Sequence, residues 1–305
     1  MKLIKPYFEI IEQGDDLFKH IELCSRTCYK SEDKITDDSA KDFVQMLINN
    51  GHTAMLEHAT VYLKLAGNIL WDKYTRNPFS KINYFDYAYF EDRYYITTNY
   101  RVLLENNWLD DLKYICQPTE HHQKRISVRF VCDRGVSHEL VRHRVFSFAQ
   151  ESTRYCNYSK DKFNNEITFI EPCWLDKSLQ SCSDFKEALN IAEQGYFELL
   201  KQGWQPQQAR AVIPNALKTE IVMTGFLSDW QGKIHVYKTD DKTYNQVRPW
   251  SPEVEKMVRD QYRVKDNLSF QLSGFFPLRT ALSAHPQMRE LAIPLYEMFK
   301  EKFKI

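Results

Sequence analysis

Apolar residues recur in short periodic blocks along most of the chain. Alternating apolar and polar positions predict strands over three segments, residues 1–11, 58–67 and 126–135. A helical spacing of apolar positions predicts helices over three others, residues 16–28, 36–52 and 184–202. A last helix opens at Pro286 and is expected to bend at Pro294, which lacks a backbone N–H. Helices that alternate with separated strands indicate an α/β or α+β fold, with a mixed sheet flanked by helices.

Two polar regions interrupt this pattern. Residues 70–122 are rich in Tyr, Asn, Asp and Trp and have weak periodicity, which is typical of an insertion or an interaction surface. Residues 231–273 are again charged and polar, with one predicted helix that opens at the sequence SPEVEKMV. The sequence contains no internal repeat and no low-complexity tract.

Composition limits the classes of partner. The chain has 305 residues, 43% of them hydrophobic, which is enough apolar surface for a sizeable core. Its 41 lysines and arginines balance 41 aspartates and glutamates, so we expect no general nucleic-acid binding, which depends on excess cations. No stretch reaches the ~20 apolar residues of a membrane helix, and the N-terminus lacks the features of a signal peptide. We therefore expect a cytoplasmic protein without membrane contact, whose seven irregularly spaced cysteines are reduced.

The segment ELVRHRVFSFAQESTRY, residues 139–155, concentrates candidate chemistry. If Ser137 caps a helix that includes Arg142, His143 and Arg144, these three side chains fan across about 200°. Since apolar residues surround them, at least one arginine should face the interior, where its guanidinium needs a carboxylate or a phosphate partner. An internal ion pair and an anionic ligand explain this pattern equally well.

A hydroxyl-rich turn with one arginine follows, at Ser152, Thr153 and Arg154, and such a turn can hold a phosphate. Arg210 and Arg279 also lie in apolar settings, where each could be a helix-end cation, but three separated segments that each supply an interior arginine favour one anion pocket. The histidines do not have the spacing of a zinc site, and we expect no metal. The chain also lacks the glycine motifs of Rossmann and P-loop nucleotide sites.

The sequence RHRVFSFAQES has the form R-H-R, seven residues, then Ser, and resembles the signature of the flavin-dependent thymidylate synthases. Further segments occur in that family's order along the chain: CSRTCYKSEDK, NNGHTAMLEH, CDRGVSHELVRHR, ESTRY, QARAVIPNAL and FFPLRTALSAHPQMRELA. The resemblance implies that family's fold in a single catalytic domain over residues 1–305, with insertions at about 66–125 and 231–273. It also implies the formation of dTMP from dUMP, with methylenetetrahydrofolate as carbon donor, FAD reduced by NADPH as hydride source, and a homotetramer that shares its active sites.

The resemblance assigns site residues by position. Those assigned to the flavin are Arg142, His143, Arg144, His52, Gln150 and Cys28. Those assigned to dUMP are Glu139, Arg142, Gln150, Ser152, Thr153, Arg154, Arg210 and Arg279. Among these, Arg279 would polarise the pyrimidine and stabilise negative charge on it. For Ser152 a nucleophilic and a binding role are both open, and the absence of a neighbouring base favours binding.

The chain also departs from the family pattern. Gln150 stands where a glutamate is frequent, Glu139 where a glutamine is frequent, and Cys28 where a serine is frequent. The asparagines expected near the flavin, around Phe226 to Ser228, are absent. Two alternatives therefore remain beside the enzyme: a nucleotide-binding relic of the family without turnover, and a nucleic-acid-binding protein that uses the arginine-rich segment and the aromatic region for stacking.

Overall fold

The computed structural model describes residues 1–66, 71–85, 93–143, 146–175, 178, 180–230 and 286–304. Statements about the structure concern these residues. Arg144, Arg279, the predicted insertion at 231–273 and its predicted helix lie outside the described residues.

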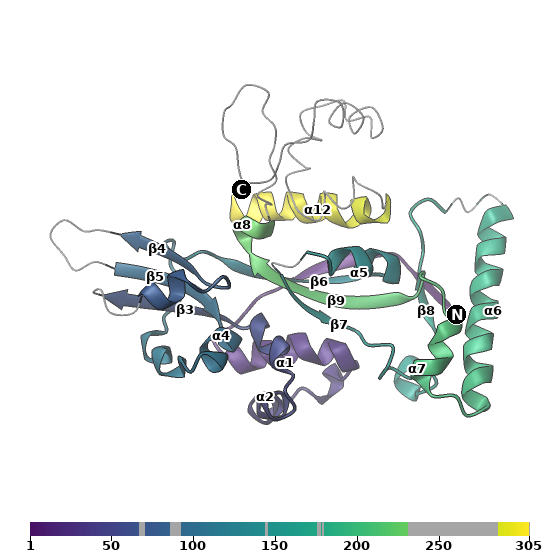
Figure 1. Ribbon diagram of the computed structural model, residues 1–305. Helices are drawn as coiled ribbons and strands as arrows, with labels where there is room; N and C mark the ends of the chain where they lie inside the picture. The colour runs from purple at the N-terminus through teal and green to yellow at the C-terminus, as the bar shows by residue number, and fades with distance from the viewer. Residues whose placement is uncertain are drawn as a thin grey trace, which may run out of the picture.

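A four-stranded antiparallel sheet forms the centre of the described chain, in the order β2-β6-β9-β7 (Figure 1). Its strands are β2 (Tyr7–Ile11), β6 (Arg125–Asp133), β9 (Lys218–Phe226) and β7 (Ser147–Gln150). The two long strands, β6 and β9, pair along their full length. Both are rich in β-branched residues, which favour the extended backbone. The α+β class predicted from the sequence is confirmed, with antiparallel and parallel pairing in separate sheets.

One face of this sheet packs against α12 (Pro286–Phe303), α8 (Leu227–Trp230) and α5 (Arg134–Leu140). Leu291, Leu295 and Phe299 recur every four residues along α12 and are at most 1% exposed. The indole of Trp230 is fully buried among them and donates to the Ile126 carbonyl at 3.2 Å. Burial of each such side chain stabilises the fold by about 1.5–3 kcal/mol. Pro286 opens α12 as predicted, and Pro294 lies inside it.

The opposite face is covered by α1 (Leu17–Arg26), with α2 (Ser39–Asn49) beneath it (Figure 1). Both helices match the sequence prediction. Asp16 starts α1, because its carboxylate accepts the N–H groups of Phe18 and Lys19 at 2.8 and 3.1 Å. The buried apolar residues of α1 and α2 form one cluster with the 3₁₀ segment η3 (Thr53–His58) and the strand β3 (Thr60–Ala66).

Most of the region from 70 to 122 is ordered structure packed on this cluster. β3 pairs with β5 (Arg93–Asn99), which pairs with β4 (Lys81–Phe85), and α3 (Trp71–Thr75), α4 (Tyr100–Glu105) and η4 (Leu109–Tyr114) complete it. Six consecutive residues of β5 are buried. A strand that is buried on both faces does not alternate, so the weak periodicity concealed it.

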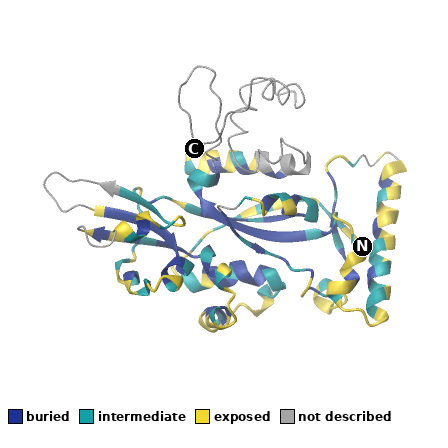
Figure 2. Ribbon diagram, in the orientation of Figure 1, coloured by how far each residue is buried: buried dark blue, intermediate teal, exposed yellow. Residues whose placement is uncertain are grey.

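The N-terminal residues form two strands instead of the single one predicted over 1–11. β1 (Lys2–Ile4) pairs in parallel with β8 (Thr168–Ile170), while β2 joins the central sheet. The break falls at Lys5–Pro6, where the proline has no N–H to donate to a ladder. The sheet β1–β8 packs with α6 (Gln180–Lys201), which carries a long exposed face (Figure 2), and with the short helix α7 (Pro206–Ala209).

The arginine-rich segment is not helical, which corrects the prediction. Asp133, not Ser137, caps α5 by accepting the Val136 N–H at 2.8 Å, and α5 ends at Leu140. The last strand residue thus also starts the helix, and the helix is too short to include Arg142. The prediction that this helix includes Arg142 and His143 is therefore wrong.

None of the seven cysteines forms a disulfide. Within the part of the chain that the structure describes, none of the helices combines the length and apolar content needed to cross a bilayer.

A buried chain of hydrogen bonds fastens α1 and η3 to the sheet. His58 Nδ1 lies 2.8 Å from Thr224 Oγ1, Thr224 Oγ1 lies 2.6 Å from Ser127 Oγ, and Ser127 Oγ lies 3.2 Å from His20 Nε2. Burial lowers the pKa of His58 to about 3 and that of His20 to about 4, with Arg125 contributing in both cases. Both imidazoles are therefore neutral in the folded protein.

These two histidines predict a loss of stability in mild acid. Below the unfolded pKa of about 6.5, the unfolded chain takes up two protons that the folded chain does not. Each histidine then lowers the free energy of unfolding by about 1.4 kcal/mol per pH unit, until the folded pKa is reached. Urea unfolding between pH 7 and 4.5 should show this slope. The double variant His20→Gln/His58→Gln should flatten it and the exposed His52→Gln should keep it, whereas an unchanged slope in the double variant would contradict the assignment.

Gly225 of β9 predicts a second effect. A Cβ atom at this position would overlap the ring of Phe146, which packs edge-on against Trp230 at 4.8 Å between centroids. Gly225→Ala should therefore destabilise the fold by about 1–3 kcal/mol through overpacking. Gly14→Ala is the matched control, since no heavy atom lies within 4 Å of the added methyl group. Equal urea midpoints for the two variants would refute this packing argument.

Candidate functional site

The turn Ser152–Thr153–Arg154 leaves the end of β7 and is fixed on both sides by main-chain hydrogen bonds. The Ser152 N–H donates to the Cys28 carbonyl at 3.0 Å, and the preceding Glu151 N–H donates to the Glu220 carbonyl at 2.8 Å. The turn is therefore held between the 3₁₀ segment η1 (Thr27–Tyr29) and strand β9. The Arg154 guanidinium lies over the Tyr155 ring at 5.5 Å and is exposed.

Arg210 brings a second segment to this turn. It follows α7, and its Nη1 donates to Thr153 Oγ1 at 2.7 Å across 57 residues of sequence. Its Nε donates to the Gln207 carbonyl at 3.2 Å, which fixes the direction of the guanidinium. The residue is exposed, so its position in an apolar stretch of sequence does not make it an interior arginine. Thr153 is 6% exposed, and the two residues set one hydroxyl and one cation side by side.

A third contact joins β7 to α5. Gln150 Nε2 donates to Ser137 Oγ at 2.8 Å and to Thr219 Oγ1 at 3.2 Å. One turn further along, Arg142 Nη1 lies 4.0 Å from Glu139 Oε1, and the Arg142 side chain is 72% exposed. Arg142 is thus not the interior arginine that a helical fan required. Arg142 lies beyond the end of α5 at Leu140, and its guanidinium is exposed to solvent.

Among the described residues assigned to the flavin, Cys28 and Gln150 are in contact, since the Cys28 thiol hydrogen-bonds to the Gln150 backbone. His52 is exposed before η3, and His143 follows α5 with its N–H donating to the Leu140 carbonyl at 3.2 Å. Cys28 is half-buried against Met55, with 3.8 Å between their sulfur atoms, and burial raises the pKa of its thiol to about 11. Cys28 is therefore a neutral thiol near pH 7. Phe226, where the family's asparagines were expected, is buried at the end of β9 beneath Lys81, 4.3 Å from its ring.

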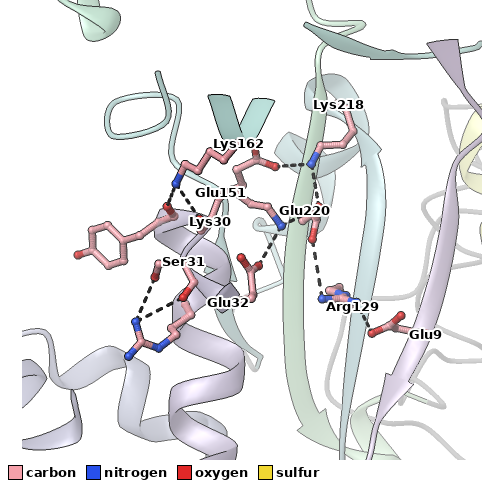
Figure 3. A network of polar contacts seen from close by, with 11 residues as sticks. Glu9, Lys30, Ser31, Glu32, Arg129, Glu151, Lys162, Lys218 and Glu220 are labelled. Atoms are coloured by element: carbon pink, nitrogen blue, oxygen red, sulfur yellow. Dashed lines mark hydrogen bonds and ion pairs between the residues drawn. The ribbon is translucent and has the colours of Figure 1, made fainter. Parts of the chain in front are cut away.

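A buried network of charges lies behind the turn (Figure 3). Lys218 Nζ is 2.9 Å from Glu151 Oε2 and 2.7 Å from Glu220 Oε1. Lys30 Nζ is 3.0 Å from the same Glu220 oxygen and 2.9 Å from Glu32 Oε1. Sequence analysis did not select these residues. The available signal was the pair Lys218 and Glu220, whose spacing of two places both side chains on one face of an otherwise apolar strand.

The two buried glutamates of this network differ in their proton affinity. Burial alone would raise the pKa of Glu220, but Lys218 and Lys30 outweigh it and hold the pKa at about 2. Burial raises the pKa of Glu151, which is 1% exposed and has only Lys218 as an ion-pair partner among the described residues. Burial opposes the charge of Lys218, but Glu151 and Glu220 together raise its pKa. The network is therefore a chain of ions with one weakly compensated end, at Glu151.

Among the described residues, no three His, Cys, Asp or Glu side chains lie close enough together to hold a metal ion.

The sequence pattern of one protein family, described as thymidylate synthase complementing protein, matches residues 115–262 of this chain. Flavin-dependent thymidylate synthase from Corynebacterium aurimucosum is 24% identical over 265 residues, which is 83% of this chain and 80% of that protein. The enzyme of the same name from Pyrococcus abyssi is 36% identical over 93 residues, 30% of this chain and 37% of the relative. The match thus spans little more than a third of the archaeal relative.

The chain thus resembles the flavin-dependent thymidylate synthase family, through a family match over residues 115–262 and relatives that carry this name. A solved structure, a UMP/dUMP methylase PolB from Streptomyces cacaoi bound with 5-Br dUMP, is 15% identical, with a TM-score of 0.34 over 92% of this chain and 96% of that one. This chain's departures from the family pattern have structural counterparts: Gln150 hydrogen-bonds two hydroxyl groups, and the Phe226 ring fills an apolar position under a lysine.

The ion network predicts an asymmetric response to substitution. Lys218→Met would leave Glu151 and Glu220 buried without their shared cation, which should cost about 3–5 kcal/mol of unfolding free energy at pH 7. The loss should shrink toward pH 5, because the two carboxyls can then share a proton. Lys201→Met is the matched control, since that lysine pairs with Glu198 on the surface, where such pairs contribute little. Urea unfolding measures both, and a similar small loss in each variant would show that the network is not energetically coupled.

Proposed function

We propose that the chain is a methyltransferase of this family that converts dUMP to dTMP, with methylenetetrahydrofolate as carbon donor and NADPH-reduced FAD as hydride source. The observation that carries the proposal is the 2.7 Å contact between Thr153 and Arg210. Two segments that the family resemblance assigns to dUMP independently are thereby in direct contact, although 57 residues separate them. The resemblance to the family supplies the reaction, and this contact supports the location of its nucleotide.

The turn suits a nucleotide phosphate. Arg154 within the turn and Arg210 beside it are exposed cations, and Ser152 and Thr153 add hydroxyl groups. Guanidinium groups and hydroxyls that converge on an anion form charge-assisted hydrogen bonds, which are stronger than neutral ones. Among the described contacts of Ser152, none joins its hydroxyl to a histidine or a carboxylate that could remove its proton. Its proposed role is therefore to bind and orient dUMP, while Arg279 is proposed to polarise the pyrimidine.

The residues proposed for FAD fit an anionic cofactor. The Arg142 guanidinium is 72% exposed and has only a 4.0 Å ion pair with Glu139, so its donors are available to a phosphate. Arg142, His143, Arg144 and His52 would hold the cofactor, with Gln150 and the neutral Cys28 thiol beside it. A bound flavin would supply hydride-transfer chemistry. The chain's own contribution would be to orient dUMP and keep its anionic groups paired.

We also propose a cytoplasmic homotetramer whose active sites are completed by neighbouring subunits. The proposed site residues lie on the surface of one chain, next to large exposed apolar side chains. Val141 adjoins Arg142 and is 39% exposed, Tyr155 adjoins Arg154 and is 53% exposed, and Val212 lies two residues after Arg210 and is 43% exposed. Aromatic residues and arginines are enriched at protein–protein interfaces, which supports contact between subunits at this surface.

Arg210→Gln tests the proposed function. The purified protein is given FAD, NADPH, methylenetetrahydrofolate and dUMP, and dTMP formation is measured. Loss of one charged hydrogen-bonding group should raise the KM for dUMP about 10- to 100-fold, with a smaller change in kcat, because the group contributes mainly to binding. The exposed Lys201→Gln should have unchanged kinetics.

Three results would decide against this assignment. Absence of dTMP from the wild-type protein, with flavin and dUMP both bound, would indicate the nucleotide-binding relic. Absence of any flavin absorption band after reconstitution would exclude FAD dependence. An unchanged KM in Arg210→Gln, with the enzyme active, would show that dUMP does not bind at the Thr153–Arg210 contact.

A further inference from the structure

A cavity of about 240 Å³ lies next to the ion network, whose residues Lys30, Glu151 and Lys218 line it. Its polar lining comes from four segments of the chain, and the residues used below are Lys2, Lys30, Glu151, Tyr158, Lys162 and Lys218. None of the residues assigned to dUMP or FAD lines it. The inference drawn from it does not depend on the proposed function.

Two buried groups in this cavity have unused hydrogen-bonding capacity. Glu151 is 1% exposed; its Oε2 has the ion pair with Lys218 at 2.9 Å but no hydrogen bond, and its Oε1 has neither among the described residues. The hydroxyl of Tyr158, a residue that is 4% exposed, also has none in the described part of the chain. A buried polar atom without a partner costs about 1–3 kcal/mol. Two such atoms on one cavity wall indicate that something else hydrogen-bonds them.

Two lysines at the cavity, Lys2 and Lys162, have no carboxylate partner among the described residues, whereas the lining carboxylate Glu166 is paired with the N-terminal ammonium group at 3.1 Å. Lys30 and Lys218 are neutralised by the glutamates of the ion network. Lys162, in contrast, has no ion pair among the described residues: its Nζ donates to the carbonyl oxygens of Tyr29 at 3.3 Å and Lys30 at 2.7 Å and lies 5.2 Å from the centre of the Phe163 ring. Lys2 forms no ion pair within the described residues. An ammonium group has three donors, so Lys162 retains capacity for an anion at the cavity mouth.

We propose that this cavity binds a small hydroxylated anion. Its carboxylate or phosphate would lie between Lys162 and Lys2, and its hydroxyl would donate to Glu151 Oε1 and contact the Tyr158 hydroxyl. Such a ligand satisfies both orphaned atoms and both unneutralised lysines at once, which neither a simple anion nor a neutral polyol does. The volume of about 240 Å³ is sufficient for one small metabolite.

Isothermal titration calorimetry on the full chain tests the proposal with four probes. Glycerol 3-phosphate and lactate each carry an anion and a hydroxyl, while inorganic phosphate and acetate carry the anion alone. At least one hydroxylated probe should bind to a single site, about tenfold or more tighter than its partner without a hydroxyl. Which pair shows the difference identifies the charged group. Equal affinities within both pairs, or no saturable heat with any probe, would overturn the proposal and leave the cavity to water.

Substitutions distinguish this cavity from the nucleotide turn. Tyr158→Phe, which removes only an unpaired hydroxyl, and Lys162→Gln should each weaken the binding of the successful probe about tenfold. The nearby exposed Lys160→Gln is the matched control and should not change it. Arg210→Gln should also leave it unchanged. If Arg210→Gln abolishes probe binding while Lys162→Gln does not, the probe occupies the Ser152 turn and the cavity proposal is wrong, whatever the outcome for dTMP synthesis.

Discussion

The pairing of β6 with β9 is the constraint on which the rest of the structure depends. In a register that runs from Arg125 opposite Phe226 to Asp133 opposite Lys218, it carries β2 on one edge and β7 on the other. The alternation of side chains then assigns the two faces, with Phe130 and Met223 toward α12 and Ser127 and Thr224 toward α1. A shift of the β6–β9 register by one residue would place polar side chains in the aromatic core and apolar side chains against α1, so the register fixes both faces together.

The candidate site uses the same alternation. Along one face of β9, Lys218 and Glu220 form the charged end, and Val222 and Thr224 continue into the contacts with α1 and η3. The turn that begins at Ser152 is bonded to this charged end through the backbone and side chain of Glu151. Burying these ions contributes little net stability, but it gives the turn one favoured position, because any displacement would separate paired charges in a medium of low dielectric constant.

The periodicity of apolar residues was sufficient to predict a helix or strand where one face of the element is buried and the other is exposed to solvent. It predicted α1, α2, α6, β3, β6 and the start of α12. It failed for β5, which is buried on both sides, and for the end of α5, where Asp133 serves both strand and helix. The resemblance selected Thr153 and Arg210 separately. Their contact depends on the tertiary fold, which the spacing of residues along the chain does not predict. The ion network was missed for the same reason, since Lys30 and Glu220 meet only after the sheet has formed.

The first two strands have a consequence for the order of folding. Lys2 pairs beside Thr168, and Tyr7 pairs beside Val131, so both strands leave the ribosome long before their partners exist. At about 5–20 residues per second, β8 follows β1 after roughly ten to thirty seconds. During that interval the apolar segment KLIKPYFEII has no sheet to join, and pairings of such sequence separation form slowly even in the complete chain. Closure of both sheets by the N-terminus is thus a late step, which makes this segment a natural binding site for chaperones during synthesis.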